Sequence, residues 1–379
     1  MTQLLIRDNA FEPQFWATVT ACTPTPQGFE VILDQTGFFP EGGGQSSDAG
    51  TLNEAAVSRV WQCPQGIVHL CREPLSVGQR VEGKVDAARR RRLMQHHTGE
   101  HVLSGLIHSR FGYDNVGFHL NTEYMTLDCN GPLSPRELEE LELASNAVVQ
   151  EDRPIRAFYP SPQEAAGLNY RSKMDIEADL RLVEIQGVDR CACCAPHLES
   201  TGQIGPIKIA AAEHYKKGMR LTVCCGQDAV ALSQRQQSQL QLLARHFSTQ
   251  PDKLMGVIQS LEEQTQKSAE ALRQCALELA RLQAQSQPGK DLLLVVSHLS
   301  PVDRAKLAQE LAGERGGLCA VLEEGPKGLS GAVANARGGL KERQKEWQQT
   351  LGAKGGGSDT LLHASFSASR QEVEAGLFE

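Results

Sequence analysis

The sequence predicts a multidomain α+β protein in four parts: a small β-barrel over residues 1–88, an α/β domain over 89–226, a helical hairpin or coiled coil over 227–287, and a small α/β domain over 288–379. Three observations predict this organisation. Apolar and polar residues alternate in the first part, helical and strand-like segments mix in the second and fourth, and Gln, Leu, Ala and Glu dominate the third. A chain of 379 residues is long enough for two or three domains.

The first part is predicted to be all β. Residues 16–22 and 29–33 alternate between apolar and polar side chains, and Pro24, Pro26 and Gly28 interrupt the pattern between them. This favours two antiparallel strands joined by a turn. Further alternation at 50–52, 58–61 and 66–70 extends the same sheet.

A glycine-rich segment at residues 34–48 separates these strands. Gly42, Gly43 and Gly44 allow positive φ angles and let a ligand approach the backbone without meeting Cβ atoms. The alternative is a flexible hairpin loop with no binding role.

The strongest chemical signal in the chain is a pair of spaced ligand motifs. His97 and His101 are four residues apart, so on a helix both side chains reach one point, and Cys193 and His197 repeat this spacing later in the chain. Three imidazoles and one thiolate form the tetrahedral N/S set that zinc favours. The alternatives are a hydrated or core histidine pair, and a site in which Cys191 or Cys194 replaces Cys193.

Two helices are expected in the second part, of which the second is clearly amphipathic. One covers residues 86–110 and stops at Gly112, and the other covers 133–150, capped by Ser134 with Pro135 at its first position. Arg89 to Arg92 cannot all point the same way on a helix, so at most two of them, here Arg89 and Arg92, would contact RNA phosphates. The alternative is a solvated helix start. Strands are expected at 155–159, 180–185 and 207–210.

The third and fourth parts differ in composition. Apolar positions at alternating spacings of four and three predict four heptads of coiled coil between 254 and 282, interrupted by Thr265 and Ser268, and Pro251 marks the helix start. In the fourth part, strands are predicted at 291–297 and 318–322 and helices at 301–313 and 337–351. These strands and helices predict a compact α/β unit.

Composition restricts the classes of function. A net charge of −8 argues against indiscriminate attraction to nucleic acid, but it allows a local basic patch. The sequence has no run of eighteen apolar residues and no export signal, so the expectation is a cytoplasmic protein that does not enter a membrane. Eleven cysteines, an odd number, then favour reduced thiols and metal binding over disulfides.

Residues 95–104, 189–197 and 200–205, together with the glycine-rich segment, resemble the AlaX-type alanyl-tRNA editing proteins and the editing domain of alanyl-tRNA synthetase. The resemblance implies a hydrolase that removes serine, and in some members glycine, from mischarged tRNA(Ala). It also implies one zinc ion held by His97, His101, Cys193 and His197. In the family's glycine-rich motif, Gln45 and Gly42 to Gly44 line the editing pocket, and the Thr36 hydroxyl meets the serine side chain.

The resemblance extends to the fourth part. Residues 352–359 resemble a glycine-rich segment in the C-terminal domain of alanyl-tRNA synthetase, so Lys354 is expected to contact RNA phosphates. The alternative is a flexible surface loop. A homodimer through the coiled coil or through this last domain is a further expectation.

Several points stay open at this level. Ala195 and Pro196 replace the family's Gly-Thr, and Pro196 removes a backbone donor from the loop. Zinc could either activate a water molecule or position the 3′-terminal adenosine while Gln45 and main-chain groups hold the water. Thr36 could be an ordinary strand residue. No class II ATP-binding signature is visible. Alternative functions are a non-catalytic tRNA-binding protein with structural zinc and an editing hydrolase for another aminoacyl-tRNA.

Overall fold

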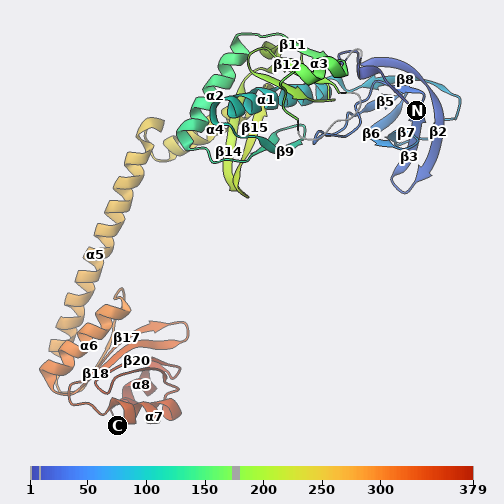
Figure 1. The fold of residues 1–379 in the computed structure, drawn as a ribbon. Helices are drawn as coiled ribbons and strands as arrows, with labels where there is room; N and C mark the ends of the chain where they lie inside the picture. Colours follow the sequence, from blue (N-terminus) through green and yellow to red (C-terminus); the bar gives the residue numbers. More distant parts are fainter. Residues whose placement is uncertain (1, 8–9, 173–179, 379) are drawn as a thin grey trace. The chain divides into compact units, whose positions relative to one another are not determined.

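The computed structural model describes residues 2–7, 10–172 and 180–378. The chain forms two compact units, Met1–Leu240 and Gln241–Glu379, which are described separately. Sheets and helices are present in both units, so the predicted multidomain α+β class is confirmed (Figure 1). The four-part boundaries at 88, 226 and 287 stay predictions.

The first unit begins with a closed barrel of antiparallel strands in the order β2-β3-β7-β6-β5-β8. Their bounds are β2 (Gln14–Thr25), β3 (Gly28–Leu33), β5 (Gly50–Leu52), β6 (Ala55–Cys63), β7 (Gly66–Cys71) and β8 (Arg80–Val85). The alternation read from the sequence places one set of apolar side chains, including Val19, Val31 and Val81, inside the barrel. The two strands expected at 16–22 and 29–33 lie in β2 and β3 and pair with each other.

The glycine-rich segment contains a two-residue strand, β4 (Gln35–Thr36), which pairs in parallel with β1 (Gln3–Leu4). The short 3₁₀ helix η1 covers Leu5–Arg7. The segment is fixed at both ends, because the buried Arg90 side chain forms an ion pair with Asp48 and donates to the Gly37 carbonyl at 2.6 Å. Gly44 lies so close to the neighbouring strand that a Cβ atom there would be 2.4 Å from the Phe118 carbonyl oxygen. This glycine loop is therefore packed in place.

Helix α1 (Ala87–Phe111) is the central element of the rest of this unit. The Asp86 carboxylate accepts a hydrogen bond from the Arg89 N–H at 2.9 Å and caps the helix, and Gly112 ends it with a φ of 69°, as predicted. Buried residues of α1, including Leu93, Leu103 and Ile107, form a core with the surrounding strands. This packing holds one face of α1 against two sheets.

These two sheets and their helices follow α1 in the first unit. One sheet has the order β14-β15-β10-β9 and the other the order β11-β12-β13, and both are antiparallel. The strands are β9 (Asn115–Leu120), β10 (Met125–Cys129), β11 (Ile155–Phe158), β12 (Leu182–Ile185), β13 (Asp189–Ala192), β14 (Ile207–Tyr215) and β15 (Gly218–Cys225). The helices are α2 (Pro135–Gln150), α3 (Pro162–Gly167) and η2 (Thr201–Ile204). Helix α2 has the predicted cap, with Ser134 and Glu137 forming a reciprocal capping box.

Two helices occupy the range for which a hairpin was predicted: α4 (Gln227–His246) and, after the short η3 (Pro251–Lys253), α5 (Leu254–Ser286). The heptad positions Leu261, Leu272 and Leu279 on α5 are exposed. Pairing of these helices as a coiled coil stays a prediction. Within the described residues, no helix is long and apolar enough to cross a membrane.

The second unit contains a sheet in the order β16-β17-β18-β20-β19, in which β16 and β17 are parallel and the other neighbours are antiparallel. The strands are β16 (Leu292–Val295), β17 (Leu318–Gly325), β18 (Gly328–Asn335), β19 (Lys354–Gly357) and β20 (Leu361–Phe366). The helices are α6 (Pro301–Arg315), α7 (Leu340–Thr350) and α8 (Arg370–Gly376). One apolar core joins the sheet to α5 and α6, and another joins it to α7 and α8. The strands and helices predicted here from the sequence are confirmed.

Candidate metal centre

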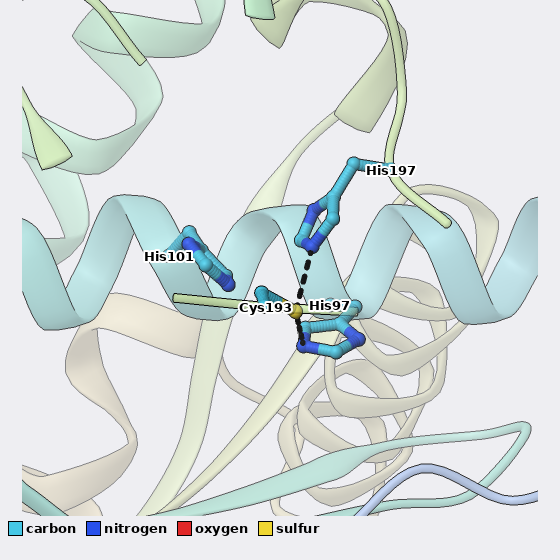
Figure 2. Close-up of side chains that lie close together, drawn as sticks. All are labelled: His97, His101, Cys193 and His197. Carbon is cyan, nitrogen blue, oxygen red and sulfur yellow. Dashed lines mark hydrogen bonds between the residues drawn. The ribbon is translucent and has the colours of Figure 1, made fainter. Parts of the chain in front are cut away.

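The four residues that the sequence singled out as metal ligands lie together in the first unit (Figure 2). His97 and His101 project from adjacent turns of α1, and Cys193 and His197 come from the loop that follows β13. The four potential ligand atoms all lie within 4.8 Å of one another, and the three histidines are buried. Two segments 92 residues apart in the sequence, from His101 to Cys193, therefore meet at one point.

Each histidine ring is held by a hydrogen bond on its Nδ1 atom. His97 Nδ1 lies 2.5 Å from Gln45 Oε1, His101 Nδ1 lies 3.0 Å from Asp189 Oδ2, and His197 Nδ1 lies 3.2 Å from Thr98 Oγ1. An amide oxygen and a carboxylate can only accept, so Nδ1 of His97 and of His101 carries the hydrogen. Nε2 is then the atom of each of these two rings that can bind a metal ion, as in other metal centres with outer-shell partners.

The Nε2 atoms face the cysteine sulfur. Cys193 Sγ is 3.6 Å from His97 Nε2 and 3.3 Å from His197 Nε2. Burial alone would raise the pKa of the Cys193 thiol, but the charges and hydrogen bonds of the surrounding histidines hold this pKa well below its usual range. Burial lowers the pKa of His197 to about 3. Cys193 as thiolate and His197 as neutral imidazole are the forms that a metal ion requires.

His101 differs from His197 because it has a charged partner. Burial by itself lowers the pKa of His101, but its hydrogen bonds to Asp189 and Cys193 outweigh this and raise the pKa well above the usual value. In the metal-free chain the His101 ring therefore retains a proton that a metal ion must displace. The donor set of three nitrogens and one sulfur fits a divalent metal ion with a preference for mixed N/S ligands.

Of the three neighbouring cysteines, Cys193 is the one grouped with the three histidines. Cys194 is exposed. Cys191 lies on another side of His101, in a second group of donors with His101 and Asp189. The Arg171 guanidinium forms an ion pair with Asp189 in that second group, with Nε 2.7 Å from Oδ1, so a positive charge already lies there.

A cavity of about 490 Å³ adjoins the four-residue cluster. His97, His101 and Cys193 form part of its wall, and the backbone of Gly42 and Gly43 forms another part. Most of the remaining wall is apolar or aromatic and includes Leu4, Ile6, Phe39, Phe118 and Tyr159. The predicted glycine loop and the predicted metal ligands thus border the same cavity, which has room for a small polar group beside the cluster.

Gln45 and Thr36, the other residues predicted for the pocket, lie in different surroundings. Gln45 is buried and holds His97, while its Nε2 atom has no hydrogen-bond partner among the described residues. Thr36 is fully buried, and its hydroxyl lies 2.8 Å from His69 Nε2 and accepts from the Phe38 N–H at 3.1 Å. Thr36 is not among the residues that line the described cavity. No sequence motif indicated His69.

The predicted RNA-contacting residues have various partners. Arg89 donates to the Ser47 carbonyl at 3.0 Å, and Arg92 forms an ion pair with Asp228 at 2.5 Å. Both side chains are partly exposed, whereas Arg91 between them is exposed. Lys354 is exposed on β19, an edge strand of the second unit.

Family models match two parts of the chain. The model described as the threonyl and alanyl tRNA synthetase second additional domain matches residues 180–221, which include Cys193 and His197. The model described as tRNA synthetases class II (A) matches residues 7–89, which contain the barrel and the glycine loop. Residues from both matched ranges, such as Phe39 and Arg181, line the cavity.

The curated relatives found are alanine–tRNA ligases. That of Methanocorpusculum labreanum is 33% identical over 88% of this chain and 39% of the relative. That of Pyrococcus abyssi is 32% identical over 74% of this chain and 32% of the relative. This chain thus spans about a third of the length of these relatives. The resemblance seen in the sequence motifs is confirmed: both matched models are tRNA synthetase domains, and the alanine–tRNA ligases are similar to most of this chain.

Proposed function

We propose that this chain is a cytoplasmic hydrolase that removes the wrong amino acid from mischarged tRNA(Ala), with serine as the main cargo and glycine as a second one. The observation that carries the proposal is the juxtaposition of the His97, His101, Cys193 and His197 cluster with a cavity bordered by the glycine loop. The relation to alanine–tRNA ligases supports tRNA(Ala) as the RNA.

Zinc is the proposed metal ion, bound by the four clustered residues. Three imidazoles and a thiolate match its usual ligands, and a buried thiolate that is stabilised by histidines favours it further. When bound, zinc would fix these four side chains and so help to position the 3′-terminal adenosine beside them. We favour this positioning role over activation of water, because four protein ligands leave no open coordination position in the usual structural geometry.

The chain's own residues would do the remaining work. Gly42 and Gly43 carry no Cβ atoms and allow the ester to approach the backbone. Gln45 orients His97, and its buried Nε2, which has no hydrogen-bond partner among the described residues, is the proposed donor to the attacking water molecule. An aminoacyl ester is already activated, so placement of the ester and a water molecule accounts for much of the catalysis required.

Selection of serine over alanine is proposed to depend on Thr36. A polar group that pairs with the serine hydroxyl is left unpaired by alanine, and such sites discriminate strongly. The Thr36 hydroxyl is bonded to His69 and Phe38, so a direct contact with serine would require exchange of one of these bonds. Phosphate contacts by Arg89, Arg92 and Lys354, and a homodimer through α5 or the second unit, complete the proposal.

A second candidate function is a non-catalytic tRNA-binding protein with a structural zinc ion, which the complete set of four protein ligands favours. Purified zinc-loaded protein given Ser-tRNA(Ala), Gly-tRNA(Ala) and Ala-tRNA(Ala) separates these functions. We expect serine to be released fastest and alanine to stay attached. Stable Ser-tRNA(Ala) in the presence of protein with one bound zinc would refute the proposed hydrolase. Release of a different amino acid from its own tRNA would indicate another editing substrate.

A further inference from the structure

On the side of His101 away from Cys193, the ring contacts the buried carboxylate of Asp189, which in turn binds the guanidinium of Arg171. Asp189 Oδ2 accepts from His101 Nδ1 at 3.0 Å. The same carboxylate accepts two hydrogen bonds from Arg171, from Nε to Oδ1 at 2.7 Å and from Nη2 to Oδ2 at 2.9 Å. This parallel two-bond geometry fixes both planes relative to each other, which a single ammonium group would not do.

The backbone holds Asp189 and Arg171 in register. Asp189 lies on β13, and Arg171 is attached to the same strand by two main-chain bonds, from the Arg171 N–H to the Arg190 carbonyl at 2.8 Å and from the Ala192 N–H to the Arg171 carbonyl at 2.9 Å. On the other side, a Cβ atom at Gly105 of α1 would lie 2.8 Å from the Asp189 Cβ. The absence of a side chain at Gly105 therefore lets α1 bring His101 to the carboxylate.

Charge explains why Arg171 is needed there. The Asp189 side chain is only 2% exposed, and a buried carboxylate without a partner is strongly unfavourable. The positive charge of Arg171 compensates the buried carboxylate of Asp189, which accepts the Nδ1 hydrogen of His101.

We propose that Arg171 is a positioning residue for the metal centre: acting through Asp189, it fixes the ring of His101 so that Nε2 faces Cys193. Arg171 itself contacts no metal ion in this arrangement. The inference rests on the metal ion of the proposed function but not on the deacylation reaction. It distinguishes Arg171 from Arg190 of the same hairpin, which binds the carboxylate of Glu184.

The test is the zinc affinity of the full chain, measured by competition with a chromophoric chelator. Arg171→Met removes the guanidinium but keeps an unbranched side chain, and we expect a roughly 10- to 100-fold loss of affinity, as for outer-shell partners in other zinc sites. Arg171→Lys keeps the charge but loses the two-bond geometry, so its zinc affinity should lie between that of the parent protein and that of Arg171→Met. Replacing zinc by cobalt gives a second readout, because a rotated His101 ring changes the visible absorption of the bound ion.

Arg190→Met is the matched control. Arg190 lies on β13 and binds Glu184 with its Nε 3.0 Å from the carboxylate, so the variant also removes an arginine–carboxylate pair from this hairpin. Glu184 contacts no member of the cluster through any described hydrogen bond. We expect Arg190→Met to bind zinc like the parent. Equal losses in Arg171→Met and Arg190→Met, or parental affinity in both, would overturn the proposal.

The test of the positioning role does not depend on the folding of one variant or on the deacylation activity. If Arg171→Met does not fold, Arg171→Lys carries the test, and unchanged zinc affinity together with an unchanged cobalt spectrum would refute the positioning role. Failure of the parent protein to deacylate any tRNA would refute the proposed function without altering these measurements. Loss of zinc affinity in Arg171→Met would still support the positioning role in that case.

Discussion

Two buried histidines in the first unit show how the surroundings of one residue type decide what it can do. His69, inside the barrel, binds only neutral groups: Nδ1 lies 3.1 Å from the Val31 carbonyl oxygen and Nε2 lies 2.8 Å from the Thr36 hydroxyl. His101, on α1, has the carboxylate of Asp189 on one side and the Cys193 sulfur on the other. Both rings are almost completely removed from solvent.

The pKa values of these two histidines shift in opposite directions. Burial lowers the pKa of His69 to about 4, and its hydrogen bond to the Val31 carbonyl oxygen offsets this only in part. For His101 the same burial is outweighed by the hydrogen bonds to Asp189 and Cys193, which raise its pKa well above the usual value. His69 is therefore a neutral, structural residue, whereas His101 can exchange a proton for a metal ion.

Among the proposed variants, removal of the Cys193 sulfur should have the greatest effect, because it takes away the negative partner of His101 and a ligand of the metal ion. Cys193→Ala deletes a direct ligand, so zinc affinity should fall by more than the ~100-fold that the loss of an outer-shell partner can cost. Deacylation should fall with it. Metal content per chain, measured by atomic absorption after gel filtration, provides the check.

Cys191→Ala and Cys194→Ala are the controls for this variant. Cys191 belongs to the group that contains the Arg171 ion pair, and Cys194 is exposed, so both variants should retain zinc. Undiminished zinc in Cys193→Ala would transfer the ligand role to one of these neighbours.

The metal cluster could be predicted from the sequence because helical geometry is local. Residues four apart on a helix share a face, so His97 and His101 required only that 86–110 be helical. The partner segment followed from the repeated spacing of Cys193 and His197 and from the resemblance. Asp189 and Arg171 were not identified, because their roles depend on a hairpin that brings them behind His101.

The surroundings of Thr36 could not be predicted in the same way. In a two-residue strand, a shift of one residue turns each side chain to the opposite face, and no local pattern fixes the register of β4 against β1. The partners of the arginines at positions 89–92 could not be predicted from the sequence either. Arg92 binds Asp228, 136 residues later, and helical periodicity contains no information about such a contact.

The strands and caps of the fold were visible in the sequence, but the order of strands in the barrel was not. Alternation marked β2, β3 and β7, and Ser134 and Gly112 marked helix ends. The pairing of β3 with β7 and of β5 with β8 joins strands that are not neighbours along the chain. Such pairings depend on how the sheet closes, which no single strand reveals.

The lowered pKa of His69 predicts that the stability of the barrel depends on pH. The folded-state pKa of about 4 lies below the ordinary value of 6.5, so between these values the unfolded chain binds more protons. The barrel should therefore lose stability as the pH falls from about 6.5 to about 4, by up to about 3 kcal/mol at the lower end. Above pH 6.5 this contribution is absent. Urea unfolding at several pH values, followed by tryptophan fluorescence, measures it.

His69→Gln is the comparison for the pH experiment. Glutamine can still bond to Thr36 but does not titrate, so the difference in stability between parent and variant should change over this pH range. Trp16 and Trp61 lie in β2 and β6 of the barrel, and a Trp347→Phe background removes the signal of the second unit. If the stability difference between parent and His69→Gln does not change with pH, burial does not lower the pKa of His69.

Thr36→Val should have a weaker effect than the other variants. It tests whether the hydrogen bond between Thr36 and His69 influences the cavity. Valine has nearly the same shape but no hydroxyl, so His69 Nε2 and the Phe38 N–H each lose a buried partner, at a cost of about 1 to 3 kcal/mol. Phe38 is followed by Phe39, which lines the cavity, so a shift there should also reduce the preference for Ser-tRNA(Ala) over Ala-tRNA(Ala) while zinc content is retained.

Thr36→Ser separates the two roles of this residue. Serine keeps the hydroxyl and should preserve both the substrate preference and the bond to His69, so only Thr36→Val should alter the ratio of kcat/KM for the two tRNAs. If Thr36→Val loses stability but keeps this ratio, Thr36 belongs with His69 to the interior of the barrel and has no part in selection. If it loses both while zinc stays bound, the buried pair inside the barrel and the cavity beside the metal ion are energetically linked through the start of the glycine loop.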